Sequence, residues 1–175
     1  MPEPAAVPAP VVVPAPVAAP TLALRPAGPA DCRFVWATRN EPSARAVSLS
    51  SEPIPYADHE QWWDSALADP ATLILVVEEP ALGPAGYVRF RIDNSAGNAE
   101  AEISIALTPA TRGRGLGSTA IQLACAHLFA SGRATHVLAR VSVSNAASLA
   151  AFGAAGFVSA STSGSDYAVL RLTQP

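Results

Sequence analysis

The segment that decides the fold reads Thr108-Pro-Ala-Thr-Arg112-Gly-Arg-Gly115-Leu-Gly117-Ser118. It joins a stretch with strand-like alternation to an apolar helical stretch, and it carries three glycines at alternate positions. Glycines let the backbone turn tightly and present its N–H groups without a Cβ in the way. The first turn of the following helix adds unpaired N–H groups and the positive end of its dipole. The segment therefore predicts a cradle for a phosphate or pyrophosphate, to which Arg112 and Arg114 add positive charge.

Two familiar phosphate-binding motifs do not fit this segment. Ser118 stands where a dinucleotide-binding fold would have its third glycine. A P-loop would need a Gly-Lys-Ser/Thr sequence, and none follows. Taken alone, the segment leaves an exposed loop without a ligand as the alternative interpretation.

Hydrophobic periodicity on either side of the segment predicts an alternation of strands and helices. Strands are expected at 21–25, 72–78, 86–92, 99–107, 135–143 and 168–172. Helices are expected at 31–39, 59–67, 117–129 and 146–154, with Asp31 and Asn145 as capping residues, and turns at 83–84 and 94–97. This order predicts an α/β fold with a central mixed sheet and helices on both faces, formed as one domain by residues 21–175.

Residues 1–20 form a Pro/Ala-rich segment that differs from the rest of the chain. It has no basic n-region, and prolines interrupt its apolar run, which argues against a signal peptide. The same prolines argue against a membrane helix. We expect an extended tail or linker and a cytoplasmic protein.

The composition of the 175 residues narrows the classes of partner. The formal net charge is −3 and lysine is absent, which argues against a general nucleic-acid binder. Cys32 and Cys125 lie far apart in apolar surroundings, so we expect two buried, reduced thiols. No short Cys/His spacing predicts a metal site.

A second motif follows the strand expected at 135–143 and reads Asn145-Ala-Ala-Ser148-Leu-Ala-Ala-Phe152-Gly-Ala-Ala-Gly156-Phe157. Asn145 can cap the helix, and Ser148 and Phe152 follow at one-turn spacing on one side of it. Gly156 ends the helix and turns the chain towards the next strand.

Together the two motifs resemble those of the GNAT superfamily of N-acetyltransferases. Its pyrophosphate loop, Arg/Gln-x-x-Gly-x-Gly/Ala, is matched by Arg112, Gly115 and Gly117. Its later motif, Asn-x-x-Ser/Ala-x-x-x-Phe/Tyr-x-x-x-Gly-Phe, is matched from Asn145 to Phe157. The resemblance implies the GNAT fold, in which two neighbouring strands splay apart, and direct transfer of acetyl from acetyl-CoA to an amine without a metal or a covalent acyl-enzyme.

The resemblance also implies a coenzyme site. Backbone groups from Ile105 to Leu107 would pair with the pantetheine arm like an added strand. Amides from Arg112 to Ser118 would hold the pyrophosphate, and the later motif would contact the far side of the coenzyme. The implied contact residues are Ile105, Ala106, Leu107, Arg112, Gly113, Arg114, Gly115, Leu116, Gly117, Ser118, Asn145, Ser148 and Phe152.

Two residues are candidates for proton transfer. Glu102 lies on the strand that splays, where the superfamily often places its general base. Burial would raise its pKa above the reference value of about 4.3; alternatively, Glu100 and Glu102 form a solvated strand face. Many relatives use a tyrosine as the acid where this chain has Phe152, which carries no proton, so Tyr87 or a water is expected in that role.

The first half of the chain resembles a narrower group, the amino-sugar N-acetyltransferases of pseudaminic acid biosynthesis. The similarity rests on the Arg-Asn-Glu-Pro sequence beginning at Arg39 and on a His-x-x-Trp spacing. It implies a nucleotide-linked 4-amino sugar as the acceptor. The expected substrate contacts are Arg39, Asn40, Arg45, His59 and Trp62, the arginines for phosphate or hydroxyls and the tryptophan for stacking.

Two other functions remain open at this stage. One is acetylation of protein N-termini or ribosomal proteins, which an acidic rather than arginine-lined cleft would favour. The other is a coenzyme A-binding module without catalytic activity, which remains open because Phe152 cannot act as the acid. A homodimer is also left open.

Overall fold

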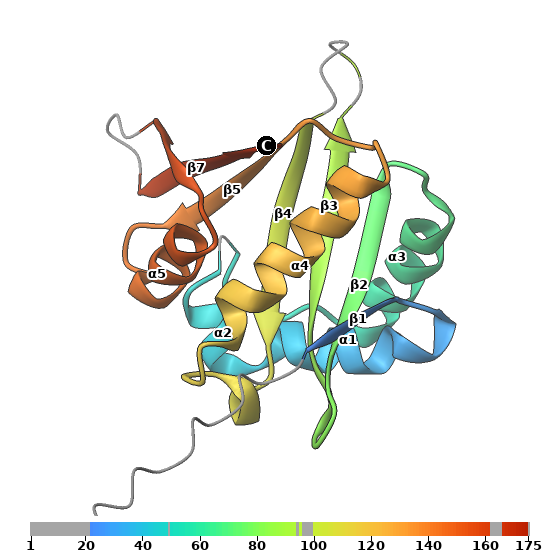
Figure 1. The fold of residues 1–175 in the computed structure, drawn as a ribbon. Coiled ribbons are helices and arrows are strands. Elements are labelled where there is room, and N and C mark those ends of the chain that lie inside the picture. The colour runs from blue at the N-terminus through green and yellow to red at the C-terminus, as the bar shows by residue number, and fades with distance from the viewer. Residues whose placement is uncertain (1–21, 49, 94, 96–99, 162–165, 175) are drawn as a thin grey trace, which may run out of the picture.

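The computed structural model describes residues 22–48, 50–93, 95, 100–161 and 166–174. Within them the chain forms one mixed sheet of seven strands in the order β1-β2-β3-β4-β5-β7-β6 (Figure 1). The strands are β1 (Ala23–Pro26), β2 (Thr72–Glu79), β3 (Gly83–Asp93), β4 (Glu100–Leu107), β5 (His136–Ser142), β6 (Val158–Ser161) and β7 (Tyr167–Thr173).

The helices lie between these strands along the chain. They are α1 (Cys32–Asn40), α2 (Pro42–Ala46), α3 (Tyr56–Ala68), α4 (Leu116–Ala130) and α5 (Ala146–Ala154). Two short 3-10 helices, η1 (Pro29–Asp31) and η2 (Pro109–Thr111), precede α1 and the glycine-rich loop. None of the helices in the described ranges is long and apolar enough to cross a bilayer.

The sheet has a split between β4 and β5. From β1 to β4 the neighbouring strands are antiparallel, whereas β4 and β5 run parallel. These two strands pair only where Glu100–Glu102 faces His136–Leu138. Beyond Glu102 they diverge, which is visible in Figure 1 as a gap that widens away from the paired end. The expected splayed pair of strands is confirmed.

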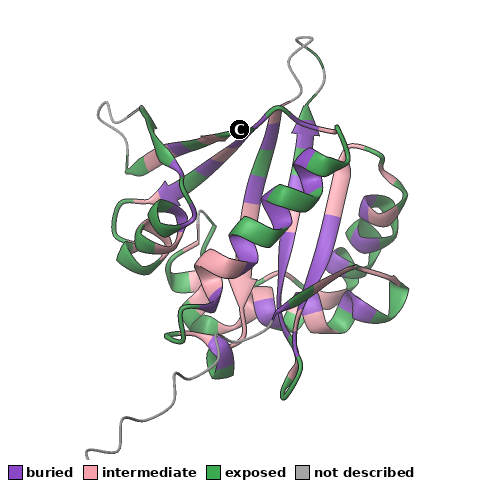
Figure 2. Cartoon of the chain, viewed as in Figure 1, coloured by how far each residue is buried: buried purple, intermediate pink, exposed green. Residues whose placement is uncertain are grey.

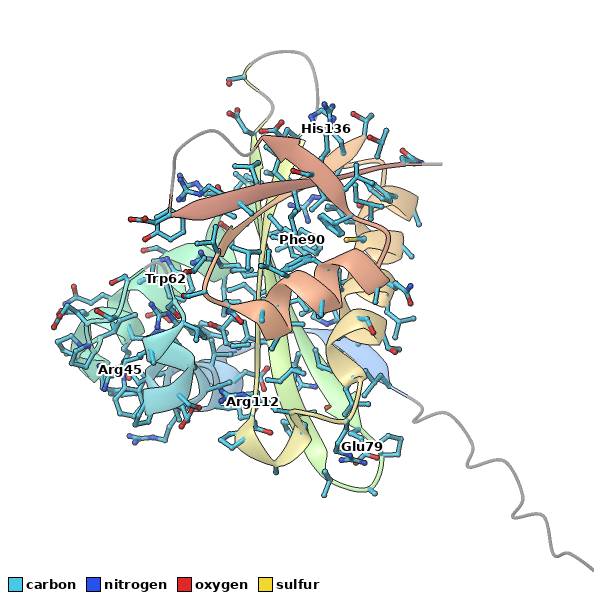
Figure 3. All side chains as sticks on the ribbon, turned by 90° about the vertical axis from the view of Figure 1, so that its left-hand side faces the viewer. Arg45, Trp62, Glu79, Phe90, Arg112 and His136 are labelled. Carbon is cyan, nitrogen blue, oxygen red and sulfur yellow. The ribbon has the colours of Figure 1, made fainter. Side chains whose placement is uncertain are left out.

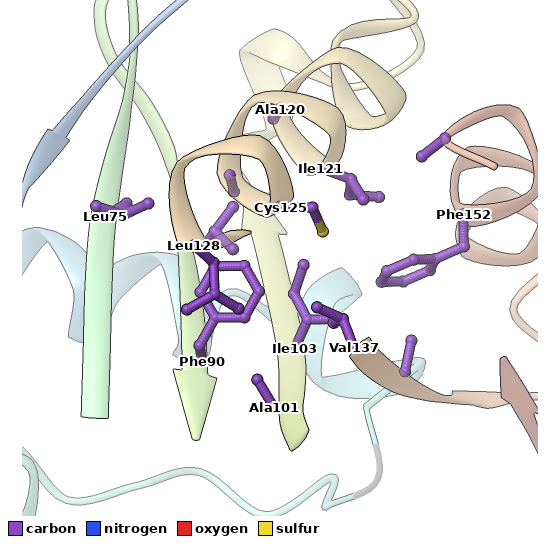
Figure 4. Packing of buried hydrophobic residues seen from close by; sticks show 14 of the residues in the cluster. Leu75, Phe90, Ala101, Ile103, Ala120, Ile121, Cys125, Leu128, Val137 and Phe152 are labelled. Carbon is purple, nitrogen blue, oxygen red and sulfur yellow. The ribbon is translucent and has the colours of Figure 1, made fainter. Parts of the chain in front are cut away.

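Alternation along the strands directs two apolar layers to opposite faces of the sheet. Side chains from β3 and β4, including Phe90 and Ile103, pack with α4 and α5 in the main core (Figure 4). On the other face, Val35 and Trp63 pack from α1 and α3 against Tyr87. The helices bury their inner sides and expose their outer sides, and the central strands are buried (Figure 2). The predicted mixed sheet with helices on both faces is confirmed.

Several local predictions need correction. Asp31 precedes α1 but does not cap it, because its carboxylate accepts hydrogen bonds from Arg25, at 2.7 and 2.8 Å, and from the Gly28 N–H. The turn expected at 83–84 lies at 80–82 instead, since β3 already begins at Gly83. The strand β6 and the one-turn helix α2 were not predicted, because both are too short to show a period.

Other predictions stand or lie outside the described residues. Asn145 caps α5, its side chain accepting a hydrogen bond from the Ser148 N–H at 3.1 Å. Cys32 and Cys125 are both free and buried, as expected, and burial raises the pKa of the Cys125 thiol to about 12. The tail expected at 1–20 and most of the turn at 94–97 fall outside the described part of the chain.

Candidate functional site

A cavity of about 1010 Å³ occupies the split between β4 and β5. We distinguish two halves of it by their lining. The coenzyme half is lined by the end of β4, the loop and first turn of α4, and α5; the acceptor half is lined by side chains of α1, α3 and β3. The acceptor half carries Arg39, Asp58, His59, Trp62, Tyr87 and Arg89.

The glycine-rich loop of the coenzyme half has the backbone that an anion cradle requires. Gly113 and Gly115 have φ angles of +70° and +74°, a region that only glycine adopts readily. Gly115 is the N-cap of α4 and offers no side chain to satisfy the free N–H groups of the first turn. No heavy atom lies within 4 Å of the place where a Cβ would stand on either glycine. The loop therefore leaves room and donors for a phosphate group.

A buried threonine, which the sequence analysis missed, holds this loop on the sheet. Thr111 is 1% exposed, and its hydroxyl donates to the carbonyl of Ala85 on β3 at 2.9 Å. It also lies 3.0 Å from the hydroxyl of Thr108. These bonds fix the position of the cradle relative to the end of β4.

Arg112 lines the cavity, but its charge is already paired within the protein. Its Nη1 lies 3.0 Å from a carboxylate oxygen of Glu41 and bonds the hydroxyl of Ser43, while its Nε donates to the Leu107 carbonyl at 2.9 Å. The Ser43 hydroxyl, backbone N–H groups and Arg112 together lower the pKa of Glu41 to about 2. The positive charge expected at Arg112 is therefore present at the cavity but is shared with Glu41. Figure 3 shows Arg112 at the opposite end of the sheet from His136.

The other expected coenzyme contacts differ in whether they line the cavity. Arg114 is exposed and does not line the cavity, whereas all the remaining ones do. Beyond Glu102, the edge of β4 that faces β5 has no strand partner among the described residues, so Ile105 to Leu107 lie beside open space. Phe152 is 3% exposed and packs edge-to-face on Phe157 at 5.0 Å between ring centroids, so it forms a wall of the cavity.

The two candidates for proton transfer have different environments. The Glu102 side chain is 49% exposed, and its carboxylate accepts a hydrogen bond from Arg140 at 3.3 Å, so the expected burial is wrong. Tyr87 is 7% exposed and lines the cavity beside Ala106, its partner on β4. Burial raises the pKa of the Tyr87 hydroxyl, and Arg89 and Arg39 oppose part of that rise. Tyr87 is therefore a protonated hydroxyl at neutral pH.

Two of the expected substrate contacts have a structural role instead. Asn40 exchanges hydrogen bonds with the backbone of Ile54, at 2.8 and 2.9 Å. Arg45 donates to the carbonyls of Asn40, at 3.1 Å, and Ser51, at 2.7 Å. Neither side chain lines the cavity. Both hold the connection between α2 and α3 against α1, so the structure does not bring them together with the other expected substrate contacts.

The remaining expected contacts do face the acceptor half. Arg39 donates through Nη2 to the Ser50 carbonyl at 2.8 Å, but its buried Nη1 has no partner within the described chain. Trp62 is 36% exposed, and the guanidinium of Arg89 lies 5.6 Å from its ring centroid. His59 is buried against both neighbouring tryptophan rings. Figure 3 places Trp62 on the side of the sheet away from α4.

The comparison with protein families decides what kind of site this is. Residues 21–158 match the family model described as the acetyltransferase (GNAT) domain. This chain belongs to the GNAT acetyltransferases. The family uses acetyl-CoA as its acetyl donor, and the resemblance inferred from the two sequence motifs is confirmed at the level of the superfamily.

Solved structures of other proteins share the fold of this GNAT acetyltransferase. A spermidine N-acetyltransferase from Vibrio cholerae, in complex with CoA and spermine, has a TM-score of 0.74 at 23% identity over 86% of this chain and 92% of that one. An aminoglycoside acetyltransferase in complex with coenzyme A has a TM-score of 0.74 at 17% identity, covering 88% and 95%. A domain from Methanocaldococcus jannaschii has a TM-score of 0.75 at 18% identity, covering 89% and 99%. No curated protein sequence matches the chain.

The coenzyme half of this GNAT enzyme fits acetyl-CoA. Its glycines with positive φ leave an open cradle at the start of α4, and the edge of β4 that has no strand partner among the described residues runs along the cavity from there. The cradle would hold the pyrophosphate and the strand edge the pantetheine arm. The narrower resemblance to the amino-sugar enzymes concerns the acceptor, so it depends on the residues of the acceptor half.

Proposed function

We propose that this enzyme acetylates the primary amine of an acceptor that carries a negatively charged group, and that the acceptor is a nucleotide-linked 4-amino sugar. The observation that carries the proposal is the excess of arginine over carboxylate in the acceptor half. Two arginines, Arg39 and Arg89, line the acceptor half, and neither has a carboxylate partner in the described residues. One acidic side chain, Asp58, lines the same half.

The positive charge of the acceptor half makes it less suited to a polyamine than to an anion. Two unit charges about 4 Å apart interact by about 4 kcal/mol at the effective dielectric of a protein surface. A polycation would meet that repulsion at Arg39 and Arg89, and a diphosphate would meet the corresponding attraction. The spermidine and aminoglycoside enzymes share the fold, but the charges of this acceptor half favour an anionic acceptor over theirs.

An aromatic wall completes the support for a ring-shaped acceptor. Trp62 exposes part of its ring to the cavity beside Arg89. An indole ring packs well against the apolar face of a sugar or a nucleobase, and a guanidinium binds phosphate oxygens in a two-pronged manner. The pair therefore suits a sugar joined to phosphate.

The protein groups divide the work of the proposed transfer. Bound acetyl-CoA supplies an acetyl thioester. The amides of the cradle and the open edge of β4 hold the donor in one orientation, so that positioning contributes much of the rate. Tyr87 keeps a proton on its hydroxyl for the leaving thiolate, because burial raises its pKa. Glu102 lines the cavity at the start of the split and is a candidate for taking the proton of the amine.

A thiol-release assay with acetyl-CoA tests the proposal on a panel of amines. The panel contains a UDP-linked 4-amino-4,6-dideoxy sugar, amino-terminal peptides, spermidine and an aminoglycoside. We expect the highest kcat/KM with the nucleotide sugar. Arg89→Gln should lower that value about tenfold or more, because it removes a charge-assisted contact, and should not lower the values for the cationic amines.

Other outcomes would identify a different enzyme. Preference for spermidine or the aminoglycoside, with no loss in the Arg89→Gln variant, would contradict the proposed acceptor and leave the acetyl donor in place. Activity on amino-terminal peptides alone would indicate the protein-acetylating alternative. Binding of acetyl-CoA without turnover of any amine would indicate the non-catalytic module.

A further inference from the structure

His59 carries a buried nitrogen that no part of the described chain satisfies. The residue is 4% exposed, yet it lines the acceptor half of the cavity. Its Nε2 is buried and has no hydrogen-bond partner within the described residues. A buried polar atom without a partner is unfavourable, so its presence in a residue that lines a cavity points to a ligand atom that completes it.

The state of the ring follows from its other contacts. A hydrogen bond with the backbone of Cys32 acts to raise the pKa of His59, which is the effect expected of a ring N–H directed at a carbonyl. Because Nε2 has no partner, the donating atom is Nδ1. In the neutral ring the proton therefore sits on Nδ1, and Nε2 presents a free lone pair. Burial lowers the pKa of His59 below 6.5 overall, so this neutral form prevails at neutral pH.

The ring is held in one position. It stacks on Trp63 with centroids 5.7 Å apart, and it lies 5.2 Å from the centroid of Trp62 on the cavity side. Trp63 is 1% exposed and fixed in the core behind it. A neutral imidazole that is held rigidly, with one nitrogen bonded and the other bare, has the arrangement of a general base.

We infer that His59, and not Glu102, takes the proton from the acceptor ammonium, an inference that rests on the proposed acetyl transfer. One N–H bond of the ammonium breaks, its proton goes to the Nε2 lone pair, and the neutral amine keeps the electron pair that attacks the acetyl carbon. The imidazolium returns the proton to solvent. Glu102 suits this role less well, because Arg140 already holds its carboxylate and it is half exposed.

The surroundings of His59 bear on its pH dependence. Arg39, Tyr87 and Arg89 contribute charge or a hydroxyl from α1 and β3, and Asp58 precedes His59 on α3. The elements packed against α3 carry further ionisable groups. On η1 and α1 these are Asp31, which is paired with Arg25, Cys32, and Arg33, which lies over the Tyr56 ring. On β2 they are Glu78 and Glu79. Burial is the largest cause of the lowered pKa of His59, and the hydrogen bond with the Cys32 backbone opposes part of it.

The test compares His59→Asn with Glu102→Gln, with His127→Gln as the control. The asparagine amide can keep the hydrogen bond to the Cys32 carbonyl while removing the basic nitrogen. His127 is exposed on α4 outside the cavity. The acceptor is the UDP-linked 4-amino-4,6-dideoxy sugar, and kcat/KM is measured from pH 5.5 to pH 9.5.

We expect His59→Asn to lower kcat/KM about 100-fold at pH 7, the usual contribution of a general base. The deficit should shrink towards pH 9, where the amine loses its proton in solution. A loss that is equal at every pH would mean that His59 only supports the fold, and a pH-dependent loss in Glu102→Gln alone would make Glu102 the base. Either result overturns the inference.

A second measurement does not depend on the acceptor. The chain has three histidines, so the His59 signals are assigned by elimination with His127→Gln and His136→Gln. In the nitrogen NMR spectrum of histidine-labelled protein at pH 7, Nδ1 of His59 should carry the proton and Nε2 should carry none. A proton on Nε2 would overturn the inference even if the variants fail to fold. Absence of turnover in the wild type would refute the proposed function, whereas turnover with an unchanged pH profile in His59→Asn would refute only the role of His59.

Discussion

Replacing Gly117 with glutamate is expected to raise the Kd for acetyl-CoA by about 100- to 1000-fold. Gly117 lies in the first turn of α4 and lines the coenzyme half. A Cβ there would stand 3.5 Å from Ala151 on α5 and 3.9 Å from Leu107 on β4, so a longer side chain must enter the space between them. Its carboxylate would then occupy the cradle and repel the pyrophosphate.

Isothermal titration with acetyl-CoA measures this effect. Gly153→Glu is the matched control, since Gly153 lies on α5, is exposed and does not line the cavity. The control should bind with wild-type affinity, and both variants should keep the wild-type circular dichroism spectrum. Wild-type affinity in a folded Gly117→Glu variant would show that the coenzyme binds elsewhere.

Replacing Tyr87 with phenylalanine is expected to lower kcat about 100-fold, because the hydroxyl that supplies a proton to the leaving thiolate is lost. The ring would still pack against Val35 and Trp63, so the fold and the affinity for acetyl-CoA should be unchanged. The raised pKa of Tyr87 means that the wild-type rate should hold up to high pH and fall only above the ordinary tyrosine value of about 10.

The measurement is steady-state turnover of the preferred amine, with binding of acetyl-CoA determined separately. Tyr56→Phe is the control, because Tyr56 does not line the cavity and its hydroxyl donates to the Cys32 sulfur at 3.8 Å. A kcat within a few-fold of wild type in Tyr87→Phe would mean that water protonates the thiolate.

Local chemistry explains which parts of the site were predictable. The glycines of the loop and the cap at Asn145 depend on neighbours within a few residues, and the structure places both as the sequence indicates. Alternation along β4 puts Ile103 in the core and leaves Glu102 exposed on the opposite face, in line with the solvated strand face considered for Glu100 and Glu102. The split between β4 and β5 came from the family resemblance and not from the local pattern.

Contacts between distant residues explain the errors. Arg112 bonds Ser43, 69 positions away in sequence, and Glu102 meets Arg140 across 38 positions. No sequence pattern shows that these arginines are paired. Likewise, Asn40 matches the expected motif but turns to Ile54, because the connection between α2 and α3 has backbone groups that need partners.

Hydrogen–deuterium exchange with and without acetyl-CoA tests most directly whether the split between β4 and β5 is the donor site. We predict that the coenzyme slows exchange at the amides of 113–118 and of 105–107, which line the open cradle and the unpaired strand edge. The backbone on the far side of the sheet, in β1, should be unaffected. Protection that spares both of these segments, or no protection at saturating acetyl-CoA, would contradict the account.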